Sequence, residues 1–219
     1  MSQPGMGGRV IWALPVEMET AAAGLVGSFD SAIQRGEARA GGHLACRVGC
    51  TGCCIGPFKI TALDAARLER GVRELTSRDP ETASALVERA SQQWGRIVEA
   101  FPGDPSTGVL SDDEAAREAF FARFGKTPCP ALDPTLGSCI VYPWRPLSCR
   151  TYGLPVHHGR QVLEPCPLNF AGASADEVAA ATIVPDPEDR EGSLLDRVRE
   201  LGVYGDTVVC AVLGGRGLG

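Results

Sequence analysis

Nine cysteines, four of them within nine residues, constrain this chain more than any other feature of its sequence. Eight of the nine form a dense set near residue 50 and a dispersed set after residue 128. The two sets are Cys46, Cys50, Cys53 and Cys54, and then Cys129, Cys139, Cys149 and Cys166. Thiolate is the softest ligand that a protein offers, and many thiolates together select zinc, copper(I) or iron–sulfur centres. The sequence therefore predicts a metal centre.

A disulfide framework is the main alternative use of so many cysteines. Disulfide-dense scaffolds are short and secreted, because such chains are too small to bury an adequate core. This chain has 219 residues, 44% of them hydrophobic, and its N-terminus has no apolar run of the length of a signal peptide. No stretch approaches the roughly 20 apolar residues of a membrane span. We therefore expect a cytoplasmic protein, outside any membrane, with metal-binding or catalytic cysteines.

The charge balance bears on the kind of partner. The net charge is −6 and the pI is about 5.2, and the sequence contains no run of Lys or Arg. Binding to nucleic acid relies on positive charge against the phosphate backbone, so it has no electrostatic support here. A protein or peptide partner remains a candidate.

Apolar residues at helical spacing predict most of the secondary structure. Helices are expected over residues 15–40, 61–75, 79–100 and 111–125, and near 175–183 and 192–202. Thr61 and Ser111 each begin a capping-box pattern, in which a side chain at the helix start accepts a backbone N–H. The helix after Ser111 is expected to bury Phe120, Phe121 and Phe124.

Residues 127–170 differ in character, with eight prolines among four cysteines. This composition predicts loops, a short strand over Cys139–Tyr142, and a hairpin over Leu154–Leu163 that turns at His158-Gly159. We therefore expect a mostly α protein with a small irregular or β cysteine-rich lobe, stapled by metal. The expected organisation is a disordered segment 1–14, a single metal-binding domain 15–170 and a C-terminal helical extension 171–219.

The spacing of the cysteines favours metal but leaves its arrangement open. Cys50-Thr-Gly-Cys53 has the two-residue spacing of a metal knuckle, which lets both sulfurs face one ion. The later four cysteines are too far apart for a local knuckle, so tertiary folding must gather them. Eight thiolates could make two four-cysteine zinc sites, two cubane clusters, or one centre with spare redox or catalytic thiols.

Other residues near the cysteines were weighed as ligands or neighbours of the centre. His43, His157 and His158 could each replace a thiolate, although ordinary polar roles are commoner. Cys210 lies in an apolar run and is expected to be a small buried hydrophobe. Arg145 and Arg150 flank Cys149, where guanidinium groups could lower a thiolate pKa, balance cluster charge or bind an anionic substrate.

The order of these residues matches a known pattern. Cys46-x3-Cys50-x2-Cys53-Cys54 precedes Cys129-Pro130-x-Leu132-Asp133, then Cys139-x-Val141-Tyr142-x2-Arg145-Pro146-x2-Cys149-Arg150-x-Tyr152, and finally Cys166. Over about residues 44–170 the chain resembles the YkgJ-type cysteine-cluster family, described as zinc- or iron-chelating. The flagellin lysine N-methylases look like relatives that carry such a domain with an iron–sulfur cluster. The resemblance implies that the eight cysteines chelate metal, with Arg145, Arg150, Tyr142 and Tyr152 around the centre or a substrate.

Three functional hypotheses follow. The leading one is a cytosolic protein with an iron–sulfur centre, preferably 4Fe–4S, that performs redox or protein-modification chemistry. The second is a non-enzymatic interaction module stabilised by zinc. The third is an S-adenosylmethionine-dependent enzyme, because Cys46-x3-Cys50-x2-Cys53 equals the spacing of the radical enzymes of that class. The third requires a partial α/β barrel with the motif just after its first strand, and the chain lacks the further length expected of the methylases.

Overall fold

The computed structural model describes residues 12–159, 161–202 and 205–214. Helices dominate these residues, so the predicted mostly α fold is confirmed. The α-helices are α1 (Val16–Ala40), α2 (Ala62–Arg78), α3 (Pro80–Ile97), α4 (Glu114–Phe124), α5 (Leu147–Thr151), α6 (Ala175–Ala181), α7 (Arg190–Glu200) and α8 (Val209–Gly214). Short 3-10 helices are η1 (Gly41–His43), η2 (Val98–Ala100) and η3 (Tyr142–Trp144).

The strands form three small antiparallel pairs in the part of the chain that the structure describes. Strand β1 (Lys59–Ile60) pairs with β6 (Thr207–Val208), and β2 (Gly103–Asp104) pairs with β3 (Val109–Leu110). Strand β4 (Val156–His158) pairs with β5 (Gln161–Leu163), which confirms the predicted hairpin. No strand precedes the first cysteine set in the described residues, so these sheets do not resemble the start of an α/β barrel.

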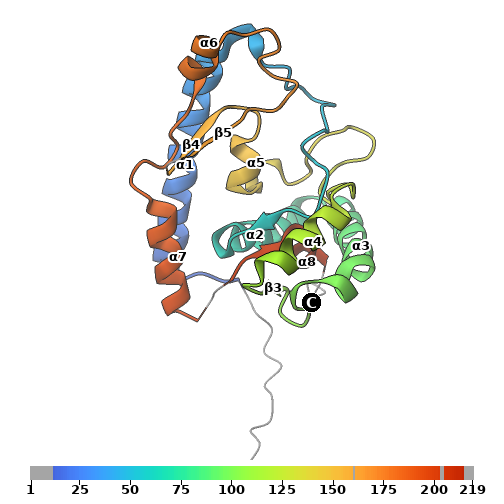
Figure 1. Ribbon diagram of the computed structural model, residues 1–219. Coiled ribbons are helices and arrows are strands. Elements are labelled where there is room, and N and C mark those ends of the chain that lie inside the picture. The colour runs from blue at the N-terminus through green and yellow to red at the C-terminus, as the bar shows by residue number, and fades with distance from the viewer. Residues whose placement is uncertain (1–11, 160, 203–204, 215–219) are drawn as a thin grey trace, which may run out of the picture.

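The elements are arranged around the long helix α1 (Figure 1). In that view α7 lies beside one half of α1, and α6 with the β4–β5 hairpin lies beside the other half. Helices α2, α3, α4 and α8 form a second layer, and α5 lies between this layer and the hairpin. Segments from the second half of the chain therefore pack against α1, which lies near its beginning.

The main core lies where α2, α3 and α8 pack together. Leu68 of α2, Leu86 and Ala90 of α3, and Leu213 of α8 are at most 1% exposed. Helix α8 approaches α3 so closely that a Cβ on Gly214 would lie 2.2 Å from the carbonyl carbon of Ala90. Burial of these side chains is the main source of stability, at roughly 1.5–3 kcal/mol for each large apolar side chain.

A second, smaller core joins α1 to the hairpin. Ile33 of α1 packs with Leu154, Val156 and Ile183, and all four side chains are buried. A Cβ on Gly36 would lie 2.4 Å from Cγ2 of Ile183, so glycine permits this close approach. This core fixes the segments that carry Cys149 and Cys166 against α1.

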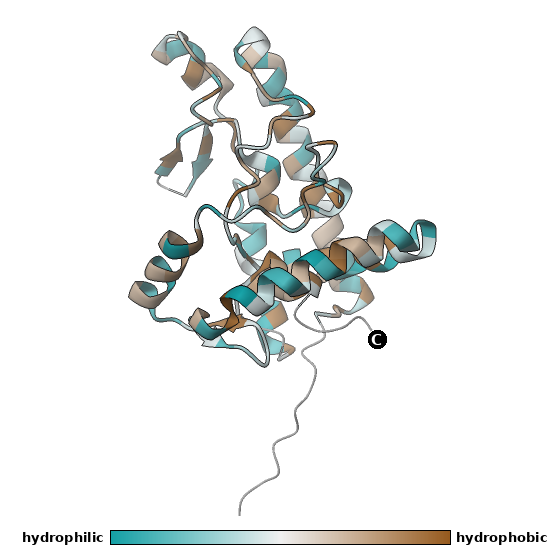
Figure 2. Cartoon of the chain, turned by 90° about the vertical axis from the view of Figure 1, so that its right-hand side faces the viewer, coloured by the Kyte–Doolittle hydropathy of each residue, from teal (hydrophilic) through white to brown (hydrophobic). Residues whose placement is uncertain are grey.

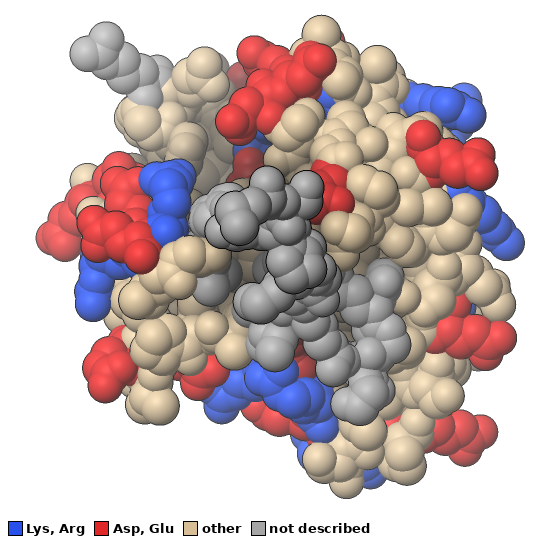
Figure 3. All heavy atoms as spheres, turned by 90° about the horizontal axis from the view of Figure 1, so that it is seen from below, with Lys and Arg blue, Asp and Glu red and all other residues tan. Residues whose placement is uncertain are grey.

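Helices α2 and α3 each have one hydrophobic and one hydrophilic side, and Figure 2 shows both kinds of residue along the long helices. Acidic and basic side chains are interspersed among uncharged ones on the face that Figure 3 shows. Among the described helices, none is both long enough and apolar enough to cross a bilayer.

Helix α2 begins as the sequence predicted, whereas α4 begins later. The hydroxyl of Thr61 accepts the N–H of Asp64 at 3.3 Å. At α4 the capping residue is Asp113, whose Oδ1 accepts the N–H of Ala116 at 3.0 Å. Ser111 lies before the helix, where its N–H donates to the carbonyl of Pro102 at 2.8 Å. Of the three phenylalanines, only Phe120 is fully buried, since Phe121 and Phe124 lie at the edge of its cluster.

The predicted strand over Cys139–Tyr142 is wrong. Cys139 makes a single isolated bridge to Leu132, and the chain then enters η3 and α5, neither of which was predicted. Pro143 and Pro146 explain the difference, because proline has no N–H for a ladder and its fixed φ suits the first turn of a helix.

The two ends of the chain contribute to the core. The disordered N-terminus was expected to reach residue 14, and residues 1–11 of it lie outside the described residues. Trp12 and Leu14 are only 2% and 9% exposed, because they pack into the main core. The expected C-terminal extension likewise supplies β6 and the buried helix α8, so it packs as part of the same unit.

Candidate metal centre

The first cysteine set lies on a loop of consecutive tight turns. The N–H of Cys50 donates to the carbonyl of Arg47 at 2.9 Å, and that of Cys54 donates to Thr51 at 2.8 Å. Within the first of these turns Gly49 has a φ of +89°, a conformation that favours glycine. The predicted loop is therefore present at this position.

Backbone hydrogen bonds bring the second cysteine set against this loop. The N–H of Cys129 donates to the carbonyl of Cys54 at 2.7 Å, and Ile55 forms an isolated bridge with Pro128. The N–H of Gly49 donates to the carbonyl of Gly137 at 3.2 Å. A Cβ on Gly137 would lie 3.0 Å from Cα of Gly49, so the loop before Cys139 approaches closely only with glycine there.

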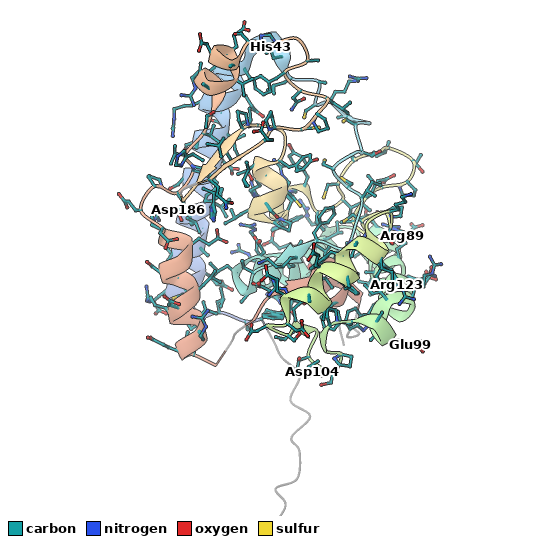
Figure 4. All side chains as sticks on the ribbon, viewed as in Figure 1. His43, Arg89, Glu99, Asp104, Arg123 and Asp186 are labelled. Carbon is teal, nitrogen blue, oxygen red and sulfur yellow. The ribbon has the colours of Figure 1, made fainter. Side chains whose placement is uncertain are left out.

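Two further contacts position Cys129 and Cys149. Arg89 of α3, labelled in Figure 4, donates through Nε to the carbonyl of Pro130 at 3.2 Å, directly after Cys129. The buried carboxylate of Asp64 accepts the N–H of Leu147 at 3.0 Å and thereby fixes the start of α5, which carries Cys149. Asp64 was predicted only as part of a capping box, so its contact with α5 was missed.

Five thiols lie near enough to one another to shift each other's pKa, and we call them the inner group. The inner group consists of Cys53, Cys54, Cys129, Cys139 and Cys149. Burial raises the pKa of Cys129 and of Cys149 to about 12, and it raises the pKa of Cys139 as well. A hydrogen bond between Cys53 and Cys54 raises the pKa of the first and lowers that of the second.

Cys46 and Cys166 are not among the five thiols of the inner group, and we call them the outer pair. The hydroxyl of Tyr152 lies near both of them, and burial together with Cys166, Cys53 and Cys46 raises its pKa. Cys46 is exposed, whereas Cys166 and the thiols of the inner group are at least half-buried. Cys50 lies in the sequence between the two groups and is half-buried.

Asn169 organises the outer pair and was missed by the sequence analysis. Its side chain is 4% exposed, and its Nδ2 donates to the carbonyl of Gly153 at 2.7 Å and to the sulfur of Cys46 at 3.5 Å. A buried amide in a loop between prolines carries no local signal of this role, because its partners are distant in sequence.

Arg145 is the arginine whose charge acts on thiols of the inner group, Cys53 and Cys139. Burial raises the pKa of Cys139, and the positive charge of Arg145 offsets part of that rise. The guanidinium carbon lies 3.6 Å from the centre of the Tyr142 ring. Its Nε and Nη1 are buried and have no hydrogen-bond partner among the described residues. Two buried N–H donors beside thiols suit a negatively charged sulfur centre.

Arg150 is directed elsewhere. Its Nη1 donates to Oδ1 of Asp30 at 2.7 Å, its Nε donates to the carbonyl of Arg145 at 3.3 Å, and its Nη2 donates to the carbonyl of Pro143. These oxygen acceptors occupy all three nitrogens of the guanidinium. Its predicted place beside the centre therefore has no contact to support it, and the structure gives it the task of joining α5 to α1.

The histidines lie outside the inner group, and Cys210 is not counted in it, although its thiol is near enough to raise the pKa of Cys129. His43 lies beside α6 (Figure 4), where its Nε2 is 3.4 Å from Oε1 of Glu177. His157 and His158 are exposed residues of β4. Cys210 is 1% exposed within α8, which confirms the predicted buried hydrophobe, and burial raises its pKa to about 12.

The donor set suits a thiophilic centre in its chemistry. All nine cysteines are free thiols, and those of the inner group are partly desolvated beside a cation with unpaired donors. Among the described residues, no three Cys, His, Asp or Glu side chains converge as closely as the ligands of one ion would. Thiolate sites of this kind close as the ion binds, because the binding free energy contributes directly to folding.

The comparison with protein families agrees with this donor set. The family model "CxxCxxCC: Putative zinc- or iron-chelating domain" matches residues 45–167, which is more than half of the chain. The protein belongs to this family of cysteine-cluster domains, and a metal-binding role follows from that membership. Neither curated proteins nor solved structures provide a match to the chain.

Proposed function

We propose that this protein is a cytosolic iron–sulfur protein whose clustered cysteines hold a 4Fe–4S centre used in redox or protein-modification chemistry. The observation that carries the proposal is the inner group itself, which consists of five free and partly buried thiols, two of them near the Arg145 cation with its unpaired donors. A 4Fe–4S cluster takes four cysteine thiolates, so the inner group alone has enough ligands. Free thiols throughout the chain are also typical of a reducing compartment.

Arg145 has a specific task in this proposal. Thiolates around a cluster leave net negative charge, which N–H donors stabilise through charge-assisted hydrogen bonds. The Nε and Nη1 donors of Arg145 are buried and free for such sulfur acceptors. Stacking on Tyr142 orients the guanidinium, and the carbonyl of Arg145 accepts from Nη2 of Arg67 at 2.7 Å, which fixes the backbone. A bound cluster of this kind supplies one-electron transfer.

A zinc-stabilised interaction module is the second candidate, and one feature favours it. The loops that carry the cysteines expose large apolar side chains, with Val48 81%, Leu136 64% and Tyr142 59% exposed. The N–H of Gly49 donates to the carbonyl of Gly137, so Val48 and Leu136 lie on adjacent loops, and contiguous exposed apolar residues are typical of surfaces that bind other proteins. The S-adenosylmethionine hypothesis gains no such support, because the described strands form only small antiparallel pairs.

Anaerobic isolation of the full chain tests the first candidate against the second. We expect a brown protein with iron and acid-labile sulfide in equal amounts. Conservative replacement of two inner thiols, Cys139→Ser and Cys149→Ser, should remove the iron and the colour. Cys210→Ala is the matched control, because it removes a buried thiol outside the inner group and should leave both unchanged. A colourless wild-type protein with zinc and no sulfide would establish the interaction module instead.

A further inference from the structure

We infer that Asp64 and Arg67, an ion pair on helix α2, are positioning residues for the centre. Asp64 is 3% exposed, and the side chain of Arg67 is 17% exposed. The pair holds the η3–α5 segment (residues 142–151), which carries Arg145 and Cys149, in its final arrangement before metal binds. The inference rests on the proposed function, because it treats Cys149 as a ligand of the centre and Arg145 as an N–H donor to it.

The first argument is that the ion pair holds the backbone on both sides of Pro146. Before the proline, the carbonyl of Arg145 accepts from Nη2 of Arg67 at 2.7 Å. After it, the N–H of Leu147 donates to Oδ1 of Asp64 at 3.0 Å. The same Nη2 of Arg67 lies 2.7 Å from the same Oδ1 of Asp64, so these contacts form one unit. Because proline also fixes its own φ, the backbone at this point has little freedom left.

The second argument is that three consecutive carbonyls before α5 accept from guanidinium groups. Nε of Arg67 donates to the carbonyl of Trp144 at 3.4 Å. Arg150 donates to the carbonyls of Pro143 and Arg145, so the latter carbonyl accepts from two arginines. Hydrogen bonds from a charged donor are stronger than those from a neutral one. Contacts between protein groups alone therefore fix this turn, without any metal.

The third argument is the packing of Trp144 on α2, the helix that carries the ion pair. A Cβ on Gly71 would lie 2.4 Å from Cγ of Trp144, so glycine lets η3 pack directly against the backbone of α2. The guanidinium carbon of Arg78 lies 5.5 Å from the centre of the Trp144 ring. Helix α2 therefore holds the segment at its 3-10 helix as well as at the start of α5.

The fourth argument is the burial of the Arg145 side chain. Its Nε and Nη1 are buried and have no hydrogen-bond partner among the described residues, which costs the desolvation of both donors. A flexible backbone would let the guanidinium turn towards water and recover that hydration. The contacts of its carbonyl with Arg67 and Arg150 keep it instead where its charge acts on Cys53 and Cys139.

Amide hydrogen exchange of the full chain, prepared without metal and measured by NMR, tests whether the segment forms first. The reporter is the N–H of Leu147, which Asp64 accepts. We expect it to exchange at least about tenfold more slowly than in the unfolded chain. Arg67→Met removes every donor of the guanidinium and should abolish this protection. Arg70→Met is the matched control, because Arg70 is an exposed arginine of the same helix that pairs with Glu74 at 2.8 Å. It should leave the exchange of Leu147 unchanged.

The reduction potential of the loaded protein tests whether the pair acts on the centre. Arg67→Met should lower the potential, as Arg145→Gln does, because the guanidinium of Arg145 is no longer held in place. Loss of the charge of Arg67 would lower it too, and a double-mutant cycle separates the two causes. In the Arg145→Gln background, Arg67→Met should cause no further fall, whereas a direct effect of charge would persist. Arg67→Lys keeps the charge but not the planar fork, and its potential should lie between those of wild type and Arg67→Met.

Each other result counts against a specific statement. Unprotected exchange of Leu147 in the metal-free wild type would overturn the inference, whichever metal the protein binds. Equal falls in potential with and without Arg145 would show that Arg67 acts by its charge alone and is not a positioning residue. Where circular dichroism shows that Arg67→Met does not fold, the exchange of wild type and the potential of Arg67→Lys decide. A zinc protein without iron would refute the proposed function together with the effect on the potential, and protection of Leu147 would still support a segment formed before metal binds.

Discussion

The guanidinium of Arg150 donates to Oδ1 of Asp30 across 2.7 Å, and this ion pair joins α5, which carries Cys149, to α1. The arginine is 8% exposed, and its remaining nitrogens donate to the carbonyls of Pro143 and Arg145. The sequence predicted that Arg145 and Arg150 both lie beside the metal. Their contacts in the structure differ, so replacing each arginine should have a different effect.

Arg150→Gln should act on stability rather than on the centre. Removing one partner of a largely buried ion pair leaves its acceptors unpaired, and we expect a loss of about 2 kcal/mol because Asp30 remains half-exposed. The reduction potential should stay where it is, because all three guanidinium nitrogens of Arg150 already donate to oxygen acceptors rather than to sulfur. Chemical denaturation and potentiometric titration measure the two effects. A potential that shifts with unchanged stability would show that Arg150 faces the centre.

Arg145→Gln should have the opposite pattern. The reduced centre is more negative than the oxidised one, so loss of a nearby cation disfavours reduction and the potential should fall. Stability should change less, because the buried Nε and Nη1 of Arg145 make no hydrogen bond that would be lost. Arg145→Lys keeps the charge but not the donor geometry, and its potential should lie between the other two. Identical potentials in all three proteins would exclude this task for Arg145.

Cys53→Ala should cost both metal and fold. Cys53 belongs to the inner group, and its charge also raises the pKa of Tyr152. Metal binding contributes directly to folding in sites of this kind, and the melting temperature should fall together with the metal content. Cys50→Ala, from the same predicted knuckle, is expected to behave alike. Full metal content and unchanged melting in Cys53→Ala would remove it from the ligand set.

Cys210→Ala should leave metal content unchanged. Its side chain is 1% exposed among the apolar residues of α8, so only packing is lost, at roughly 1 kcal/mol. Cys210→Ala and Cys53→Ala each remove one thiol. Comparing their melting temperatures and metal contents tests whether the position of a thiol, rather than the number of thiols, determines metal binding. Metal loss in Cys210→Ala would place its thiol among the ligands.

The metal-free protein should lose stability in alkali. Burial raises the pKa of Cys129 and of Cys149 from 9.0 to about 12. A group whose pKa is raised by folding stabilises the folded state below its unfolded pKa, and that contribution is lost as the pH rises through its folded pKa. The free energy of unfolding should therefore fall between about pH 9 and pH 12. Denaturation at several pH values measures this for wild type and for Cys129→Ser/Cys149→Ser. The free energy of unfolding should fall less steeply with pH in the variant.

The affinity for metal should rise with pH, whereas the stability of the metal-free protein falls. The same thiols are protonated at neutral pH, and each must release its proton to bind an ion. Affinity should thus rise with pH, by roughly tenfold per pH unit for each proton released. Competition with a chelator at several pH values, together with proton release in weakly buffered solution, measures this. An affinity independent of pH would mean that the ligands are not these thiols.

The sequence by itself determined the local features of this protein. Apolar periodicity and a capping residue predicted the helices from Val16 to Phe124, because both signals act within a few residues. The glycine-rich loop around Cys50 and the hairpin at His158-Gly159 were equally local. The donor chemistry was also evident, since eight clustered cysteines indicate metal whatever the fold.

Only the tertiary structure decided which side chains meet. Asp30 and Arg150 are 120 positions apart, and Asn169 and Cys46 are 123 apart, so no local pattern predicts either contact. The same holds for the division between the inner group and the outer pair, which depends on how the loops around Cys54, Cys129 and Cys139 pack. Arg145 and Arg150 are similar in sequence context, but packing leaves free donors on one and gives oxygen acceptors to the other. Burial and pairing of a polar side chain are properties of the packed chain, because they depend on every segment that surrounds it.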